Sequence, residues 1–253
     1  MRRVLAFSLL LLALAGPFGS TGEGFTANWA ALDTAPGSAR ALAAGYWWGT
    51  DELGRDAWVR LCLGLRGSLA VSAMAVGLSA ALGLFLGASL GTLRGFAGTV
   101  AARVVDILAS MPLTLLALVL VSSLGRSLWS VAAVLGLLGC VPVARAVRVA
   151  IVAAQAEAHY LVAGLHGATS FEQFRWTLLP AMGSACQTSS VLLLPQVLIA
   201  EGTLGFLGLS IPDPGISLGG LLVESAGRAT QAPLAVVGPS VLVFLLLLVV
   251  RPR

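Results

Sequence analysis

The sequence contains no lysine, and all fifteen of its basic residues are arginines. The P-loop of ATP-hydrolysing proteins places a lysine on the β- and γ-phosphates. The chain therefore cannot carry a standard P-loop, and a partner must supply the ATPase if ATP drives its activity. The sequence also lacks HExxH and Gly-x-Ser-x-Gly motifs and shows no convincing catalytic triad. We expect a protein that is not an enzyme and that binds no cofactor itself.

Charged residues are scarce. Only 10% of the 253 residues are charged, whereas 58% are hydrophobic and the mean hydropathy is +0.95. An ordinary soluble domain carries about 25% charged residues. A chain this apolar could not cover its surface with polar groups in water, and apolar runs between short charged loops are typical of helices in a bilayer. The composition predicts an all-α polytopic membrane protein surrounded by lipid.

Residues suited to nucleic-acid binding or metal coordination are also few. The net charge is +4, but the arginines are scattered between apolar runs rather than clustered on one face. Cys62, Cys140 and Cys186 form no CxxC pair and are expected to be small apolar side chains in or near membrane helices. The only histidines are His159 and His166, and a metal site needs further ligands. We expect no metal site and no nucleic-acid partner.

Six apolar stretches predict about six transmembrane helices, because about 20 apolar residues are needed to cross the hydrocarbon core. They are Val4–Gly19, Ser68–Leu90, Val104–Leu124, Leu128–Val143, Ala185–Ala200 and Leu234–Val250. The first stretch is short and follows Arg2 and Arg3, so it also fits a cleaved signal peptide. Because no clear small-x-small cleavage site follows, we expect an uncleaved first span. Pro195 is expected to kink the fifth span.

The segments between the spans divide the chain into two parts. Residues 1–66 would comprise the first span, an external loop and a helix at Leu53–Arg66 that lies at the membrane interface, with its arginines reaching toward water. Residues 67–253 would form the core, with a polar loop at 144–183 between the fourth and fifth spans and a Gly/Pro-rich loop at Glu201–Pro233.

The placement of the arginines favours a cytoplasmic N-terminus. In that orientation nine arginines lie in the inner segments and six in the outer ones, which is a mild positive-inside bias. The loop at 144–183 then faces the cytoplasm, and the protein is a multi-pass component of the cell membrane.

One span carries a stripe of glycines. Gly83, Gly87 and Gly91 are four residues apart, so they lie on one helix face and allow another backbone to approach closely. Glycine is also common throughout this chain. The stripe therefore favours close helix packing and does not by itself indicate a dimerisation motif.

The polar loop at 144–183 contains two helix signals separated by a glycine. Val147–Leu165 has helical character, and Gly167 offers a stop at which a left-handed backbone is expected. Thr169-x-x-Glu172 and the overlapping Ser170-x-x-Gln173 are capping-box patterns, so a second helix should begin there and end at Pro180. Its apolar residues fall on one face at helical spacing; they are Phe171, Phe174, Leu178 and Leu179. The lipid interface, the protein's own spans or a groove on a partner could bury that face.

The same loop resembles the EAA loop of binding-protein-dependent ABC importers. Gly167, nine intervening residues, Thr177 and then Leu179-Pro180 match the back half of that pattern, with Thr177 in place of isoleucine. Leu161-Val162-Ala163 stands where E-A-A would stand.

Two further stretches resemble the dipeptide, oligopeptide and nickel permeases among these importers. The first is similar to their GTDxLGRD signature and reads Gly49-Thr50-Asp51-Glu52-Leu53-Gly54-Arg55-Asp56. The second is similar to the AExSLSFLGLGxxPP segment after the fifth span and contains Glu201, Phe206, Leu207, Gly208 and Pro214, with Asp213 in place of the first proline. Arg103-x-x-Asp106 with Pro112, and Ala144-Arg145-x-x-Arg148, match further family patterns.

This resemblance implies the permease subunit of an ATP-driven importer for di- or oligopeptides, with nickel or another small solute as the alternative. It implies ABC ATPase subunits that bind ATP and dock on the cytoplasmic loop, a homologous permease subunit that completes the path, and an extracytoplasmic solute-binding protein. The residues implied in ATPase coupling are Ala163, Gly167, Ala168, Phe171, Phe174, Leu179 and Pro180.

A secondary transporter driven by an ion gradient is the rival interpretation. Such a protein would favour ionisable residues in the middle of its spans. The predicted spans carry none there, and Asp106 and Glu201 are expected at span ends, where a charge reaches water cheaply. The residues therefore favour the importer.

Overall fold

A computed structural model describes residues 24–43, 45–93, 95–209, 211–212, 215–227 and 233–250. Within these residues the chain is helical, and extended backbone pairs only in an isolated antiparallel bridge between Thr50 and Asp56. The helices are η2 (Trp29–Ala31), α2 (Ala39–Ala43), α3 (Ala57–Thr92), α4 (Gly95–Ser110), α5 (Leu113–Leu124), α6 (Leu128–Ala156), α7 (Ala158–Leu165), α8 (Ser170–Gln173), η3 (Phe174–Leu178), α9 (Leu179–Leu204), η4 (Gly205–Leu209), α10 (Leu218–Ala226) and α11 (Pro233–Val250). The predicted first span, Val4–Gly19, lies outside the described residues.

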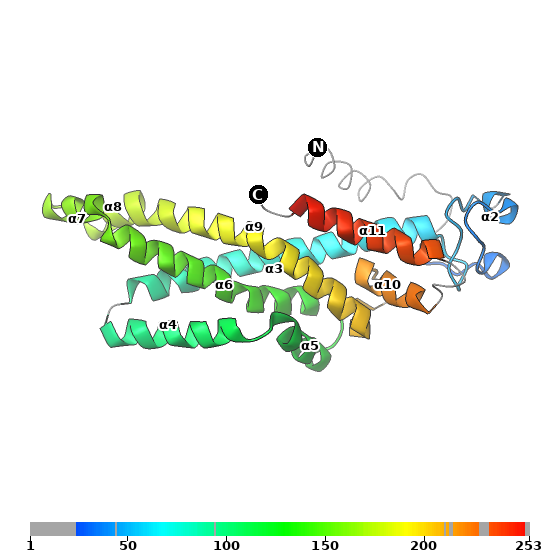
Figure 1. Ribbon diagram of the computed structural model, residues 1–253, viewed down its shortest axis with the longest axis horizontal. Helices are drawn as coiled ribbons and strands as arrows, with labels where there is room; N and C mark the ends of the chain where they lie inside the picture. Colours follow the sequence, from blue (N-terminus) through cyan, green and yellow to red (C-terminus); the bar gives the residue numbers. More distant parts are fainter. Residues whose placement is uncertain are drawn as a thin grey trace.

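The helices form an elongated bundle around α3, α6 and α9, which lie side by side (Figure 1). At one end α6 is followed by α7 and α8, and the chain turns back there into α9. The opposite end, called the far end below, holds α2, α10 and the beginnings of α3 and α11. α3 and α9 therefore connect the α7–α8 end of the bundle with the far end, whereas α6 begins beside α5 (Figure 1).

Three described helices are long and apolar enough to cross a membrane: α3, α6 and the continuous run Ser170–Leu209 that contains α9. The bent pair α4–α5 counts as a fourth if it forms one span, and α11 is a shorter apolar helix. The prediction of an all-α polytopic membrane protein is confirmed. The number of six spans stays a prediction.

The glycine stripe of α3 packs against α6. A Cβ added to Gly83 or Gly87 would stand 2.5 or 2.6 Å from the Cβ of Val143 or Val147, and one added to Gly91 would meet Ile151. Only a hydrogen in place of the side chain allows the two backbones to come this close. The predicted close packing is confirmed, and within this chain α6 occupies the glycine face.

The predicted interfacial helix at Leu53–Arg66 is wrong as a separate element. One continuous helix, α3, runs from Ala57 to Thr92. No proline interrupts this stretch, and Gly67 provides a close contact instead of a break, because an added Cβ would strike the Ile216 carbonyl oxygen. Arg60 does not reach toward water, as its side chain is only 2% exposed.

The predicted span Val104–Leu124 is broken into two helices. α4 ends at Ser110, α5 begins at Leu113, and their axes differ by 83°. Pro112 occupies the N-cap of α5. A proline disfavours helical backbone at the residue before it, here Met111, so the break falls where the sequence contains a proline.

The predicted loop Glu201–Pro233 contains the helix α10. The Ser217 hydroxyl accepts a hydrogen bond from the Gly220 N–H and caps this helix. Gly219 lies against the α9 backbone, where an added Cβ would stand 2.8 Å from the Gly202 carbonyl oxygen. Its glycines therefore pack α10 closely onto α9 instead of leaving the segment irregular.

Two other helices are longer than predicted. α6 continues from Leu128 through Pro142 to Ala156, well beyond the expected end of the fourth span at Val143. α9 likewise continues through Pro195. Each of these prolines removes one backbone hydrogen bond from its helix. Packing in the bundle nevertheless keeps both helices continuous.

Candidate functional site

Two regions contain the residues that the sequence singles out: the α7–α8 corner, residues 158–180, and the far end. The corner begins where α7 ends at Leu165. The Gly167 N–H bonds the Gly164 carbonyl at 3.1 Å, and the Ala168 N–H bonds the Ala163 carbonyl at 3.0 Å. These two bonds form a Schellman motif, which needs a left-handed residue after the helix. Gly167 has φ +83°, as predicted.

The next helix begins with a capping box. The Thr169 hydroxyl accepts a hydrogen bond from the Glu172 N–H at 3.3 Å, and Glu172 Oε2 accepts one from the Thr169 N–H at 2.7 Å. This reciprocal pair satisfies two backbone donors at the start of α8. The predicted helix start is confirmed, and Thr169–Glu172 is the pattern that forms it.

The predicted helix end at Pro180 is wrong. Pro180 lies in the first turn of α9, where a missing N–H is tolerated. It follows a π-helical turn, Phe174–Leu178, in which the Leu179 N–H bonds the Phe174 carbonyl. The extra residue of a π turn shifts the helix phase. Leu178 therefore points into the core at 5% exposure, and the predicted apolar face is split.

The corner exposes apolar side chains. Phe171 is 70% and Trp176 74% exposed, and Leu165 is 87% exposed. α7 and α8 bury none of their residues. The spans that the structure describes therefore do not cover these side chains, which leaves the lipid interface or a partner groove. Among the other predicted coupling residues, Phe174, Leu179 and Pro180 are exposed, and Ala163 and Ala168 are half-buried.

The two histidines of the corner lie in separate contacts. His159 Nδ1 is 3.0 Å from Glu157 Oε2, and His166 Nδ1 is 2.9 Å from the Val162 carbonyl oxygen. In the described part of the chain, no three His, Cys, Asp or Glu side chains come together as metal ligands.

The family pattern around Asp106 also forms a contact. Asp106 Oδ1 on α4 is 3.4 Å from Arg145 Nε on α6. This exposed ion pair joins the two helices near the corner half of the bundle, and pairs of this kind contribute little to stability.

At the far end, the GTDxLGRD stretch forms a tight loop before α3. Gly49 and Gly54 have φ +75° and +72°. An added Cβ at Gly54 would strike the Asn28 carbonyl oxygen, and one at Gly49 would strike that of Thr34. Thr50 lies inside the loop, where its Oγ1 accepts a hydrogen bond from the Thr34 N–H at 3.0 Å. The glycines are therefore required both by backbone conformation and by space.

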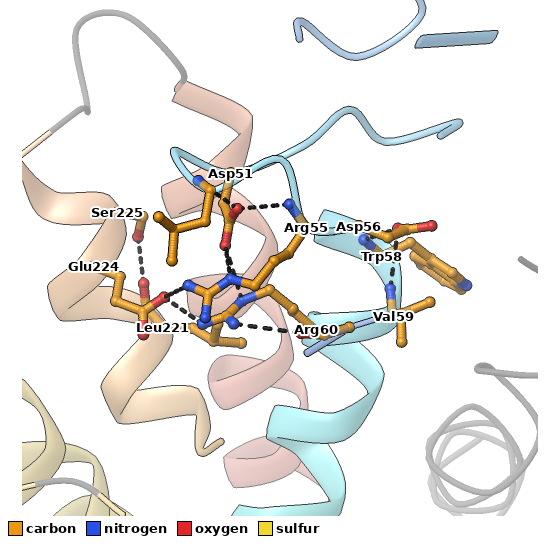
Figure 2. Close-up of polar contacts among 11 residues, drawn as sticks. Asp51, Arg55, Asp56, Trp58, Val59, Arg60, Leu221, Glu224 and Ser225 are labelled. Carbon is orange, nitrogen blue, oxygen red and sulfur yellow. Dashed lines mark hydrogen bonds and ion pairs between the residues drawn. The ribbon is translucent and has the colours of Figure 1, made fainter. Parts of the chain in front are cut away.

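Asp51 organises the charges of this loop. Its Oδ1 accepts hydrogen bonds from the N–H groups of Leu53 and Arg55, at 3.0 and 2.8 Å. Its Oδ2 lies 2.7 Å from Arg55 Nε and 3.3 Å from Arg60 Nε. Glu224 on α10 completes the group, because its Oε2 lies 2.5 Å from an Arg60 terminal nitrogen and 3.7 Å from one of Arg55. Figure 2 shows these four residues, called the arginine cluster below.

Asp56 begins α3. It is 1% exposed, and its Oδ1 accepts hydrogen bonds from the N–H groups of Trp58 and Val59, at 2.8 and 3.2 Å. These bonds satisfy donors that an α-helix leaves unpaired at its N-terminus. Leu53, by contrast, is 38% exposed. Most of the GTDxLGRD stretch therefore fixes the entrance of α3 and its connection to α10.

The second signature segment lies at the end of α9. Glu201 is 3% exposed, so its expected place in water is wrong. The Ser68 hydroxyl donates to Glu201 Oε2 at 2.9 Å and accepts from the Leu218 N–H at 3.1 Å, which joins α9, α3 and α10. Phe206 and Leu207 are each 57% exposed. Pro214 lies outside the described residues.

Gly208 ends this segment with φ +79°. Its carbonyl oxygen accepts a hydrogen bond from Arg126 at 3.0 Å. The loop between α5 and α6 is thereby joined to η4 at the far end.

A cavity of about 660 Å³ opens beside the arginine cluster. Its walls come from the GTDxLGRD loop, the beginning of α3, the end of α10 and the beginning of α11. Its size is typical of small-molecule sites.

Sequence reasoning missed two members of the arginine cluster, Arg60 and Glu224. Arg60 and Arg66 are the charged residues of the apolar run that begins α3, and Glu224 is the last acidic residue of the sequence. Isolated opposite charges in apolar surroundings tend to pair with each other. That signal could have indicated the contact, although it could not have placed α10 beside α3.

A profile of the family described as "Binding-protein-dependent transport system inner membrane component" matches residues 81–253. The chain is 33% identical over 177 residues to the dipeptide transport system permease protein DppC of Bacillus subtilis (strain 168), covering 70% of this chain and 55% of that protein. It is 30% identical over 230 residues to the oligopeptide transport system permease protein OppC of the same organism, and this match covers 89% of this chain and 72% of that protein. The chain thus spans about half to three-quarters of the length of these relatives.

A solved structure is also similar. The MetNI methionine ABC transporter, in inward-facing conformations, contains a chain that matches with a TM-score of 0.59 and 18% identity. The match covers 76% of this chain and 91% of that one. At this identity the similarity concerns the fold alone.

Proposed function

The chain belongs to the family of binding-protein-dependent transport system inner membrane components, and from this premise we propose that it is the permease subunit of an ATP-driven ABC importer for di- or oligopeptides. The names of the dipeptide and oligopeptide relatives support the substrate class. The protein would be a multi-pass component of the cell membrane, with its N-terminus and the α7–α8 corner in the cytoplasm.

The observation that carries this proposal is the shape and surface of the α7–α8 corner. The Schellman motif at Gly167 and the capping box at Thr169 hold two short helices at a fixed angle. Exposed apolar side chains of the corner, including Phe171 on α8 and Trp176 on η3, face away from the bundle. A rigid apolar projection of this kind suits a groove on a partner protein. The partner would be an ABC ATPase subunit.

The ATPase must be a separate subunit, because the chain has no lysine for a P-loop. ATP-dependent closure of two ATPases would pull on the corner, and α9 would transmit the movement toward the far end. A homologous permease would complete the path, and a solute-binding protein would deliver the peptide at the far end. Saturable ATP hydrolysis by this chain alone, purified in lipid, would contradict the proposal that a separate subunit hydrolyses ATP.

The decisive experiment substitutes Gly167. Nothing lies within 4 Å of a Cβ added there, so Gly167→Asp should leave the bundle intact while placing a charge in the docking surface. We expect normal membrane abundance, lost peptide uptake and weak co-purification of the ATPase, with a smaller effect for Gly167→Ala. Gly125→Asp is the matched control, since Gly125 has φ +88° and equally open surroundings between α5 and α6.

Wild-type uptake by Gly167→Asp at normal abundance would refute coupling through the corner. Phe174→Ala separates the two possible burial sites of the apolar surface. Loss of ATPase retention with the spans still inserted indicates a partner groove, whereas unchanged retention indicates the lipid interface.

A further inference from the structure

Three arginines lie where α4 and α6 adjoin, in the half of the bundle toward the corner. Arg103 on α4 stands one turn before Asp106, and Arg148 on α6 stands one turn after Arg145. The ion pair between Asp106 and Arg145 places these turns side by side. Because α4 runs away from the corner and α6 runs toward it, Arg103 and Arg148 both lie on the corner side of this pair (Figure 1). Arg103, Arg145 and Arg148, called the α4–α6 arginines below, therefore form one group.

This group carries more positive charge than its helices balance. Asp106 is the one carboxylate in the sequences of α4 and α6, so the three arginines leave a net charge of +2 (3 − 1). Asp106 contacts Arg145, whereas no hydrogen bond or ion pair among the described residues involves Arg103 or Arg148. The Nε of Arg148 is buried without an acceptor. Because an unpaired charge in apolar surroundings is costly, the group needs an anion from outside the chain.

The sequence of α6 indicates the level of these arginines in the membrane. Seventeen uncharged residues, Leu128–Ala144, precede Arg145 in this helix (144 − 128 + 1). They rise about 26 Å, close to the thickness of the hydrocarbon core. At the opposite end of this run Trp129 is exposed, as is typical of an aromatic side chain at the membrane interface. Arg145 and Arg148 therefore lie at the level of the lipid headgroups on the corner side.

Apolar side chains surround the arginines on the outer surface. Val104 and Ile107 of α4 are exposed, and so are Val149 and Val152 of α6. Acyl chains would cover these side chains, whereas a water-soluble anion would leave them uncovered. The ligand that fits both parts of the surface therefore has an anionic head and an apolar tail.

We propose that the α4–α6 arginines bind the phosphate group of an anionic phospholipid, whose acyl chains lie along the exposed apolar side chains of α4 and α6. Guanidinium groups match the oxygens of a phosphate, and basic residues between spans suit anionic headgroups on the cytoplasmic side. A carboxylate of a partner subunit would balance the charge but would not supply the acyl chains. The inference goes beyond the proposed function and takes from it only the cytoplasmic orientation of the corner.

The test uses the full chain, purified in detergent, and native mass spectrometry with added lipids. We expect one molecule of phosphatidylglycerol to bind with a Kd about tenfold lower than that of phosphatidylcholine with the same acyl chains, because only the first headgroup is anionic. Arg148→Gln should raise the Kd of phosphatidylglycerol about tenfold, the loss of one charge-assisted hydrogen bond. Equal Kd values for the two lipids would refute the proposal.

Arg126→Gln is the matched control. It removes the same charge, but the Arg126 guanidinium bonds the Gly208 carbonyl oxygen at the far end. We expect this variant to bind phosphatidylglycerol like the wild type. If it weakens binding as much as Arg148→Gln does, the lipid responds to net charge and the site is refuted.

Thermal unfolding checks that the variants fold. Arg148→Gln should fold, since no hydrogen bond among the described residues is lost. If it does not, Arg103→Gln takes its place and should weaken binding of phosphatidylglycerol about fivefold, the effect of one basic residue near the membrane surface. Unchanged binding in the folded variant would overturn the proposal.

Two further measurements identify the source of the anion. Inorganic phosphate and glycerol 1-phosphate lack acyl chains, so an excess of either should leave the lipid bound. Displacement by either one would overturn the proposal in favour of a site for a soluble anion. The importer assembled with its ATPases and second permease should retain the lipid, and loss of the lipid on assembly would overturn the proposal in favour of a contact between subunits. Because no arm measures peptide uptake, the lipid site and the permease function can fail separately.

Discussion

The far end of the bundle buries charged side chains, whereas the α7–α8 corner exposes apolar ones. Arg60 is 2% exposed and contacts both Asp51 and Glu224, while Phe171 and Trp176 are 70% and 74% exposed. Buried and paired charges hold helices in one arrangement, and exposed apolar groups lower their free energy only when something covers them. The arginine cluster therefore finds its partners within this chain, whereas the apolar side chains of the corner need contact with something else to be covered.

The largest expected effect comes from breaking the arginine cluster. Arg60→Met leaves Asp51 and Glu224 without their buried partner, which should lower the free energy of unfolding by about 3 kcal/mol, the lower part of the usual range, because Glu224 is half-exposed. Thermal unfolding in detergent measures this loss. The double variant Arg60→Met/Glu224→Leu should recover part of it. If Arg60→Met left thermal unfolding unchanged, the arginine cluster would not stabilise the far end.

A matched pair of glycines compares the two ends directly. Gly54 and Gly167 both have positive φ, at +72° and +83°, but only at Gly54 would a Cβ strike a backbone atom. Gly167→Ala should cost about 1 kcal/mol for the backbone conformation alone, and Gly54→Ala about 2 kcal/mol or more because of the added contact. Equal unfolding temperatures for the two variants would contradict the difference in packing.

Removing the cap of α8 should have a smaller and local effect. Thr169→Ala loses the hydrogen bonds of the hydroxyl with the Glu172 N–H and carboxylate, whereas the backbone N–H of residue 169 can still donate to Glu172. The stability of the helix start should fall by about 1 kcal/mol. Hydrogen exchange should therefore become faster at Ser170–Gln173 and remain unchanged in α3. Unchanged exchange at α8 would mean that its start is held by other contacts.

The smallest effect on stability is expected at the exposed surface of the corner. Trp176→Ala should alter the free energy of unfolding by no more than about 0.5 kcal/mol, since the side chain is 74% exposed. ATPase co-purification should nevertheless fall. If Trp176→Ala clearly lowered the free energy of unfolding but left ATPase co-purification unchanged, the corner would stabilise the fold and would not be a docking surface.

Features encoded by neighbouring residues could be predicted from the sequence. The left-handed Gly167, the Thr169 capping box and the close packing at Gly83 each depend on a pattern within a few residues. For the same reason, the helix end at Leu165 and the helix start after Thr169 agree with the structure.

Features that depend on distant residues could not be predicted. Pro180 was expected to end a helix, but a π turn in the bundle places it in the first turn of α9. Glu201 was expected in water, yet it is buried and accepts a hydrogen bond from Ser68, which lies 133 positions earlier in the sequence. The position of Glu224 beside Arg60 likewise requires α10 to pack on α3, which no local pattern encodes.

The glycine contact between α3 and α6 has a consequence for how the protein is made. Gly87 and Val147 are separated by sixty positions (147 − 87), and α4 and α5 are synthesised between them. Until α6 has been synthesised, the glycine face of α3 has no helix to pack against. It contacts the insertion machinery or lipid during that time. Assembly of the bundle is therefore ordered in time, with α3 inserted early and docked late.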